Sequence, residues 1–211
     1  MGALVVLRIL LERYHQGGYC KCLFSGRKRN LFQQKTSGQQ IAMRIMNAFL
    51  IAAISADGFI TPAGGTTTSS TSWTSAEDKK FFVQKTKEAG VMIMGSRTYE
   101  TIGKPLPGRH TIVYSDDKIY EGVETTRQNP RLLLEDLKRR GYTEVAICGG
   151  STIYTMFMEA GLLDVLYLTV EPVVFGQGVP LFSRSVSAHL SLRAMTPLNK
   201  HTILLEYGVG N

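Results

Sequence analysis

The sequence has few of the residues that would indicate disulfide bonds or a metal site. Its 211 residues include 3 cysteines, Cys20, Cys22 and Cys148, too few and too irregularly spaced for a disulfide framework. This usage predicts a reducing compartment, and we expect a cytoplasmic protein. One lysine separates Cys20 from Cys22, which is a weak metal signal, and the 4 histidines are scattered, so we expect no metal site.

Long apolar runs are also missing. The apolar run over residues 3–11 is interrupted by Arg8 and is much shorter than the roughly 20 residues of a membrane-spanning helix. It has neither the preceding charge nor the following small-residue cleavage site of a secretory signal. We therefore expect no membrane partner.

Acidic residues are scarce only at the start of the chain. The net charge is +7, but residues 1–42 hold 7 basic residues and 1 acidic residue, which leaves 17 basic and 16 acidic residues for 43–211. We interpret 1–42 as a basic, flexible N-terminal extension, either an organelle transit peptide or, as we favour, a segment upstream of a start at Met43. Residues 43–211 form the predicted globular domain and are long enough to bury a core.

A function of a different class would use this extension. A non-catalytic nucleotide or nucleic-acid binder would contact phosphates through it, with an affinity that falls steeply as salt rises. The nearly neutral domain argues against this alternative, so we expect no nucleic-acid partner. Deleting 1–42 separates the classes, because an enzyme keeps its activity without the extension.

Apolar runs alternate with helical patterns along residues 43–211. Helices are expected to start at Ser75, Ser96, Pro130 and Ile153, and residues 61–72, rich in Gly, Ser and Thr, are expected to form a loop. Most apolar runs have no alternation, as in strands that helices cover on both faces. The pattern predicts an α/β sandwich with a mostly parallel central sheet and an antiparallel C-terminal hairpin. The expected strands are 46–55, 91–94, 111–114, 144–148, 165–170, 190–195 and 201–207.

Two strand-to-helix junctions have residues that suit an anion. In the first, Ser96 and Thr98 are candidate N-caps, and Arg97 adds a positive charge beside the free amides of the helix start. Glu100 is expected in the first turn of this helix. In the second, residues 149–152 are Gly-Gly-Ser-Thr, which permits close approach of a pyrophosphate, although such a turn often only crosses over a sheet.

A stiff segment follows the first junction. Residues 104–109 are KPLPGR, in which two prolines restrict the backbone and Gly108 permits a tight turn. Arg109 is therefore expected on a rigid elbow.

Asp78 has the position of a helix cap. Ser75 and Asp78 have the spacing of a capping box, in which the acid accepts a hydrogen bond from the amide of the cap residue. From the residues alone, this structural role is the better interpretation. Glu77, one position earlier, is the rival acid for any functional role.

The stretch MGSRTYETIGKPLPGR, residues 94–109, closely resembles the part of dihydrofolate reductases where a strand, a cofactor-binding helix start and a substrate-binding arginine follow one another. The resemblance covers residues 43–209. It departs from the family at Ser96, where a basic residue is usual, and in the loop 61–72, which is longer and lacks the proline before the tryptophan. The segment FGQGVPLF, residues 175–182, more closely resembles the reductase domain of riboflavin biosynthesis, which has the same fold.

The resemblance implies NADPH-dependent reduction of a small molecule, 7,8-dihydrofolate, to tetrahydrofolate. The alternative is reduction of the ribosylaminopyrimidine of riboflavin synthesis or of another pterin. By the family's spacing from Trp73 and Phe82, Asp78 would be the catalytic acid, and a cis peptide is implied between Gly149 and Gly150. The substrate pocket would be formed by Ala52, Ala53, Trp73, Phe82, Leu106, Arg109, Cys148 and Thr169. NADPH would be bound by Ala53, Ile60, Gly95, Ser96, Arg97, Thr98, Ser115, Gly149, Gly150, Ser151, Thr152, Ile153 and Tyr154.

Overall fold

The computed structural model describes residues 46–64 and 72–210. The predicted extension 1–42, with Cys20 and Cys22, and most of the predicted loop 61–72 lie outside these residues. Within the described residues, no helix is long and apolar enough to cross a membrane.

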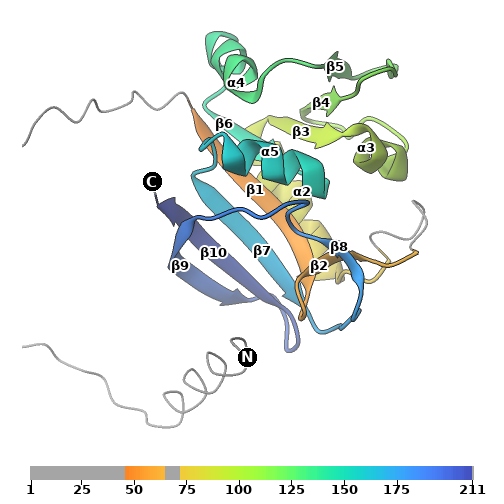
Figure 1. Ribbon diagram of the computed structural model, residues 1–211, viewed down its shortest axis with the longest axis vertical. Coiled ribbons are helices and arrows are strands. Elements are labelled where there is room, and N and C mark those ends of the chain that lie inside the picture. Colours follow the sequence, from red (N-terminus) through yellow and green to blue (C-terminus); the bar gives the residue numbers. More distant parts are fainter. Residues whose placement is uncertain (1–45, 65–71, 211) are drawn as a thin grey trace, which may run out of the picture. The chain divides into compact units, whose positions relative to one another are not determined.

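An eight-stranded sheet with strand order β5-β4-β3-β6-β1-β7-β10-β9 forms the centre of the domain (Figure 1). Strand β1 pairs in parallel with β6 and β7, and β3 pairs in parallel with β4 and β6. Strand β10 is antiparallel to both β7 and β9, so the predicted sheet with its C-terminal hairpin is confirmed. The strands are β1 (Asn47–Ser55), β3 (Val91–Gly95), β4 (His110–Tyr114), β5 (Glu124–Thr126), β6 (Glu144–Ile147), β7 (Val165–Glu171), β9 (His189–Pro197) and β10 (Ile203–Gly210).

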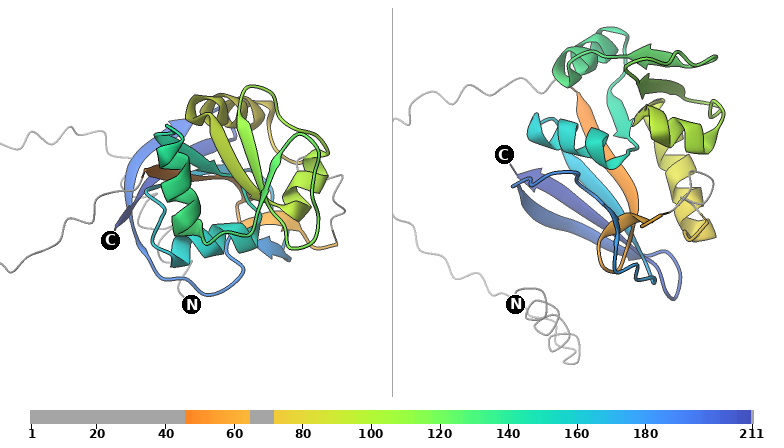
Figure 2. Two further views of the ribbon diagram at one scale, coloured as in Figure 1. Left: turned by 90° about the horizontal axis from the view of Figure 1, so that it is seen from above. Right: turned by 45° about the vertical axis from the view of Figure 1, so that its right-hand side comes forward.

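Helices cover the sheet on both faces, which gives three layers (Figure 2). Helices α2 (Ala76–Ala89) and α3 (Ser96–Ile102) lie on one face, and α4 (Pro130–Arg139) and α5 (Ser151–Glu159) lie on the other. Side chains alternate between the two faces along β1, because successive residues of a strand point in opposite directions. Leu50 packs with α4 and α5, whereas Phe49 and Ile51 pack on the side of α2 and α3.

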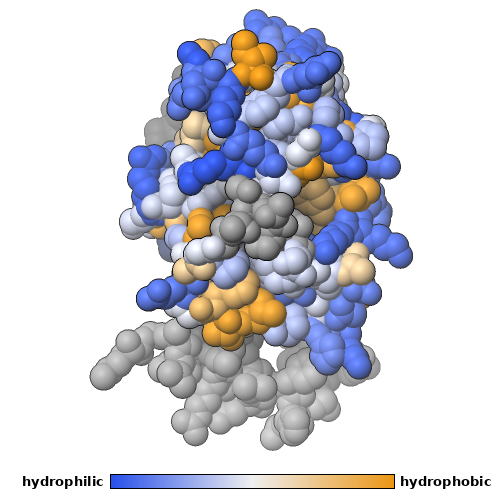
Figure 3. Space-filling model, turned by 90° about the vertical axis from the view of Figure 1, so that its right-hand side faces the viewer, coloured by the Kyte–Doolittle hydropathy of each residue, from blue (hydrophilic) through white to orange (hydrophobic). Residues whose placement is uncertain are grey.

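A second, two-stranded sheet lies beside the main one and is not predicted from the sequence. Strand β2 (Phe59–Pro62) pairs in antiparallel fashion with β8 (Gly178–Pro180), so part of the expected loop 61–72 is a strand. A Cβ on Gly178 would lie 2.2 Å from the carbonyl oxygen of Thr61, so this pairing requires glycine. Val174 and Val179, before and within β8, are among the most exposed large apolar side chains, and apolar surface gathers in patches on this side of the molecule (Figure 3).

Candidate active site

The cap of α2 differs from the predicted capping box. Ser75 is the N-cap, and its hydroxyl accepts a hydrogen bond from the amide of Asp78 at 3.1 Å. The reciprocal bond is absent among the described residues, because the amide of Ser75 donates instead to Glu171 Oε1 at 2.7 Å. The expectation that Asp78 accepts from the cap amide is therefore wrong, and its carboxyl group is available for another role.

Asp78 is a buried acid beside the carboxyl end of β7. Only 9% of the residue is exposed, and its carboxyl group accepts hydrogen bonds from the side chains of Thr169 and Thr74. Burial raises the pKa of Asp78, and the nearby charge of Glu171 raises it further, while the hydrogen bond from Thr169 opposes the change. A raised pKa lets a buried acid keep its proton to a higher pH than an exposed acid does, which suits it to proton donation.

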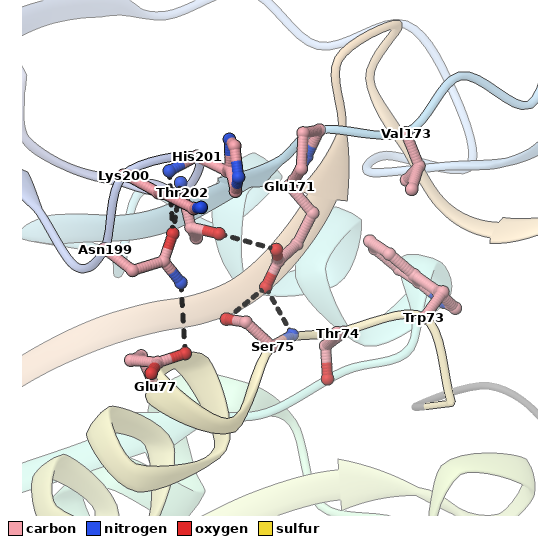
Figure 4. A pocket seen from close by; sticks show the side chains of 11 residues that line it. Trp73, Thr74, Ser75, Glu77, Glu171, Val173, Asn199, Lys200, His201 and Thr202 are labelled. Atoms are coloured by element: carbon pink, nitrogen blue, oxygen red, sulfur yellow. Dashed lines mark hydrogen bonds between the residues drawn. The ribbon is translucent and has the colours of Figure 1, made fainter.

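The rival acid, Glu77, lies outside this environment. Its Oε2 accepts a hydrogen bond from Asn199 Nδ2 at 3.0 Å, on the loop between β9 and β10 (Figure 4). Glu77 is exposed, and hydrogen bonds from its own amide and from Asn199 lower its pKa. An exposed acid with a lowered pKa stays ionised, so Glu77 is unsuited to proton donation.

The sheet supplies the surface that faces Asp78. Thr169 is the register partner of Ala53, and Cys148 is buried in the cluster on the α2 side, where Phe82 and Leu106 pack at its edge. These residues therefore lie on the α2 side of the sheet, and all five are predicted pocket residues: Ala53, Phe82, Leu106, Cys148 and Thr169. Ala52 does not, because its side chain is buried in the opposite cluster with α4 and α5, and Ile60 packs against that cluster too. The side chain of Ala52 therefore lies on the face opposite to Asp78, and its role in substrate binding stays a prediction.

Trp73 lies at a hollow of about 440 Å³ next to the start of α2 (Figure 4). Its ring packs edge-on against Phe175, with ring centroids 5.1 Å apart, and Val173 lies beside it (Figure 4). Its indole Nε1 is buried and has no hydrogen-bond partner in the described part of the chain. A buried donor without a partner is costly, so this nitrogen is suited to a water or ligand acceptor.

Arg109 is anchored to α2 by one end of its guanidinium group. Its Nη1 donates to the carbonyl oxygen of Val83 at 3.2 Å and to Thr86 Oγ1. Gly108 before it has φ +79°, which gives the predicted tight turn, and burial lowers the pKa of Arg109. The Nε atom is buried and has no partner in the described residues. The anchored group therefore presents an unsatisfied donor, as a bound carboxylate requires.

The two predicted anion junctions meet in space. The amide of Gly95 donates to the carbonyl oxygen of Gly149 at 2.7 Å, and a Cβ on Gly150 would lie 3.3 Å from Thr98 Oγ1. The peptide between Gly149 and Gly150 is cis, as the resemblance implies. Two helix N-termini, those of α3 and α5, are thus brought together where backbone glycines leave room.

The cap residues of these helices differ from the prediction. The N-caps are Gly95 and Gly150, and neither helix start has a side-chain cap, so Ser96 and Thr98 are not caps. Glu100 lies beyond the first turn and accepts hydrogen bonds from Lys118 at 2.6 Å and Tyr120 at 2.8 Å. Strands β3 and β6 lead almost directly into their helices, which leaves the glycines at the cap positions. Both helix starts keep uncapped amides that favour an anion.

The first turn of α5 offers a ligand mainly its backbone amides, because most of its side chains are buried. Ile153 and Tyr154 are buried, and the tyrosine hydroxyl donates to the carbonyl oxygen of Ile51 at 2.8 Å. Ser151 donates its hydroxyl to the carbonyl oxygen of Pro180 at 2.7 Å, so only the side chain of Thr152 is exposed. The cofactor-binding role of Ile153 and Tyr154 stays a prediction.

Ser115 lines a second hollow, of about 540 Å³, after the ends of β4 and β5. Its hydroxyl accepts from the amide of Lys118 at 3.0 Å, and its carbonyl oxygen accepts from Arg127 Nε at 3.2 Å. Lys118 and Arg127 also line this hollow and are not among the predicted site residues. The rule that ligands bind beyond the carboxyl ends of parallel strands would have found them. Arg97 is exposed at the start of α3, and Tyr120 hydrogen-bonds to Ser96.

A family model described as dihydrofolate reductase matches residues 48–175, more than half of the chain. The chain belongs to the dihydrofolate reductase family. The family assignment makes it an enzyme of the dihydrofolate reductase-like superfamily of oxidoreductases. Within the described residues, no group of three metal-ligating side chains accompanies this site.

Relatives with similar sequences include dihydrofolate reductases and a protein without an assigned activity. The dihydrofolate reductase of Staphylococcus aureus is 32% identical over 90 residues, which is 42% of this chain and 52% of that enzyme. The match therefore spans about half of the enzyme's length. The uncharacterized protein YyaP of Bacillus subtilis is 23% identical over 148 residues, 62% of this chain and 77% of YyaP.

Solved structures with the same fold come from both branches of the superfamily. A putative riboflavin biosynthesis protein from Shewanella sp. PV-4 superposes with a TM-score of 0.68 at 21% identity, over 79% of this chain and 100% of that chain. Dihydrofolate reductase from Enterococcus faecalis, complexed with NADP(H) and RAB-propyl, superposes with a TM-score of 0.58 at 26% identity, over 80% of this chain and 98% of that chain. The Shewanella structure shows the fold alone.

Proposed function

We propose that the protein catalyses NADPH-dependent reduction of 7,8-dihydrofolate to 5,6,7,8-tetrahydrofolate. One observation carries this proposal: Asp78 and the anchor of Arg109 lie on one helix, and both present groups that the fold leaves available. Asp78 starts α2, and Arg109 binds that helix at Val83 and Thr86. Eight residues separate Asp78 from Thr86, which is about 12 Å along a helix axis. This spacing suits an elongated ligand with a polar heterocycle at one end and a carboxylate at the other.

Asp78 would bind and protonate the heterocycle. The side chains of Thr169 and Thr74 hold its carboxyl group, and burial keeps it protonated at a higher pH than an exposed acid. Reduction of the pterin imine adds a hydride to carbon and a proton to nitrogen. Asp78 would promote the proton transfer, directly or through a water molecule.

The junction of the two glycine turns fits a dinucleotide. Uncapped amides at the starts of α3 and α5 favour the pyrophosphate, and Gly95 and Gly150 leave no Cβ to obstruct it. When bound, NADPH would supply the hydride. Ser96, Arg97, Thr98 and Ser115 would select the ribose 2′-phosphate, because a guanidinium group binds phosphate well. Lys118 and Arg127 add positive charge beside Ser115.

The proposal is tested by following nicotinamide absorbance with dihydrofolate as substrate. The parent protein should oxidise NADPH only when dihydrofolate is present, and an Asp78→Asn variant with an unchanged circular dichroism spectrum should lose most of this turnover. Glu77→Gln is the matched control, because it neutralises the neighbouring exposed acid, which bonds to Asn199 and not to Thr169 or Thr74. A parent protein that leaves dihydrofolate unchanged would refute the proposal.

Reduction of the riboflavin-pathway ribosylaminopyrimidine is the second candidate. The segment 175–182 supports it, since this part of the chain resembles the riboflavin reductases more closely. That substrate has a ribose phosphate in place of the glutamate tail of folate. The partnerless Nε of Arg109 suits a ligand carboxylate or a ligand phosphate, so it does not separate the two substrates, and the resemblance of residues 104–109 to dihydrofolate reductases is what favours folate.

A further inference from the structure

Glu171 is a buried carboxylate that no sequence pattern singles out. It ends β7, and only 2% of the residue is exposed. Its Oε1 accepts hydrogen bonds from the amide and the hydroxyl of Ser75, each at 2.7 Å, and its Oε2 accepts one from Thr202 Oγ1 at 2.9 Å (Figure 4). Burying a carboxylate is costly unless such donors satisfy it. These three donors satisfy Glu171, and two of them belong to the cap residue of α2.

We propose that Glu171 is a positioning residue that holds the cap amide of α2 and thereby keeps the carboxyl group of Asp78 at Thr169 and Thr74. In a capping box, the acid at the position of Asp78 accepts from the amide of the cap residue, here Ser75. In this protein the amide of Ser75 donates instead to Glu171 on β7, which is 96 residues away in sequence. Asp78 is then left to Thr169 and Thr74. This inference rests on the proposed role of Asp78.

The loop between β9 and β10 is tied to α2 at two points, which provides an internal control. One tie runs from Thr202 through Glu171 to Ser75. The other runs from Asn199 to Glu77 on the exposed side of the helix. Both ties join the same loop to the same helix turn, but only the first occupies the cap amide. Loss of the second tie should therefore leave Asp78 in place.

The pKa of Asp78 reports where its carboxyl group lies, because this pKa depends on the groups around it. Glu171 on β7 raises the pKa of Asp78, Lys79 on α2 lowers it, and Tyr154 on α5 is the other titratable group coupled to it. Tyr154 stays neutral near pH 7, because burial raises its pKa well above 10. If Asp78 turned to the amide of Ser75, the new hydrogen bond would lower its pKa.

Two variants at position 171 separate the acceptor from the charge. Glu171→Met fills a similar volume without offering an acceptor, so Asp78 should turn to the amide of Ser75. Glu171→Gln keeps one acceptor oxygen for Ser75 but removes the charge. The pKa of Asp78 is measured by 13C NMR titration of its carboxyl carbon in the ligand-free protein, with Asp78→Asn to assign the signal. The values of kcat and KM for dihydrofolate are measured in parallel.

Loss of the Glu171 charge lowers the pKa of Asp78 in both variants, and we expect Glu171→Met to lower it further than Glu171→Gln does. Glu171→Met should also lower kcat about tenfold to hundredfold, with a smaller change in KM. Glu171→Gln should keep kcat at low pH near the parent value, with its pH profile moved to lower pH. Glu77→Ala, the control, should change neither quantity.

Three results would overturn the inference. The first is a folded Glu171→Met variant in which the pKa of Asp78 is lowered no more than in Glu171→Gln, and the second is a Glu77→Ala variant in which the pKa of Asp78 and kcat are both lowered. The third is a folded Glu171→Gln variant that loses kcat about tenfold or more at low pH, and this result remains informative if Glu171→Met does not fold. A parent protein that does not reduce dihydrofolate would refute the proposed function instead, because the NMR titration tests the position of Asp78 without any substrate.

Discussion

Arg109→Ala should weaken the binding of dihydrofolate. The size of the loss follows from which nitrogen atoms of the guanidinium group are free to bind a ligand. Nη1 is already used by Val83 and Thr86, so only Nε and Nη2 remain for a ligand carboxylate. Hydrogen bonds to charged groups contribute about 1.5–3 kcal/mol. Since about 1.4 kcal/mol corresponds to a tenfold change in affinity, loss of this contact should raise KM for dihydrofolate about tenfold to hundredfold.

The assay compares KM for dihydrofolate with KM for a dihydropterin that lacks the glutamate tail, both followed by nicotinamide absorbance. The truncated substrate offers no carboxylate to Arg109, so its KM should change much less. Lys104→Ala is the matched control, because it removes an exposed positive charge from the same proline-stiffened segment. An unchanged KM for dihydrofolate in Arg109→Ala would show that Arg109 only stabilises the turn against α2, and the reasoning from its free Nε would be refuted.

Three further predictions concern Asp78 and Arg97. Asp78→Asn should lower kcat about hundredfold to ten-thousandfold, the usual contribution of general acid catalysis, whereas Glu77→Gln should keep it; a fully active Asp78→Asn variant would exclude the catalytic role. Asp78→Asn should also raise the melting temperature at neutral pH. The folded pKa of Asp78 lies above its ordinary value of 3.8, so its ionisation destabilises the fold above that folded pKa. The gain should shrink as pH falls through the folded pKa towards 3.8, and a gain that grows on acidification would contradict the raised pKa. Arg97→Ala should reduce the preference for NADPH over NADH, measured as a ratio of kcat/KM; equal use of both cofactors by the parent protein would exclude the 2′-phosphate assignment.

The parallel sheet and the glycine junctions are predictable because the chain encodes them locally. The apolar run 46–55 is long and has no alternation, so it specifies a central strand, and β1 lies at Asn47–Ser55. Gly149 and Gly150 follow a buried strand directly, and they meet Gly95 and Thr98 as the family resemblance requires. The strand and the glycine turn each depend on residues that are neighbours in sequence, whereas the meeting of the two junctions depends on the order of the strands, in which β3 lies beside β6.

The features that the sequence does not predict depend on contacts between distant residues. The spacing of Ser75 and Asp78 is correct for a capping box, but Glu171 competes for the same amide from another strand. Strands β5 and β8 have 3 residues each, too few to show a period. Ala52 and Ala53 are both small, but neighbours on a strand point to opposite faces, and only the packing of the helices determines which face each one takes.

The central claim is that the substrate is dihydrofolate, and the most direct test is a comparison of two substrates in one assay. The value of kcat/KM with NADPH is measured for dihydrofolate and for the riboflavin-pathway ribosylaminopyrimidine, on the same preparation of the full chain. We predict a higher value for dihydrofolate, because residues 104–109 resemble the substrate-binding segment of dihydrofolate reductases. A higher value for the ribosylaminopyrimidine would contradict the claim and assign the site to riboflavin-type chemistry.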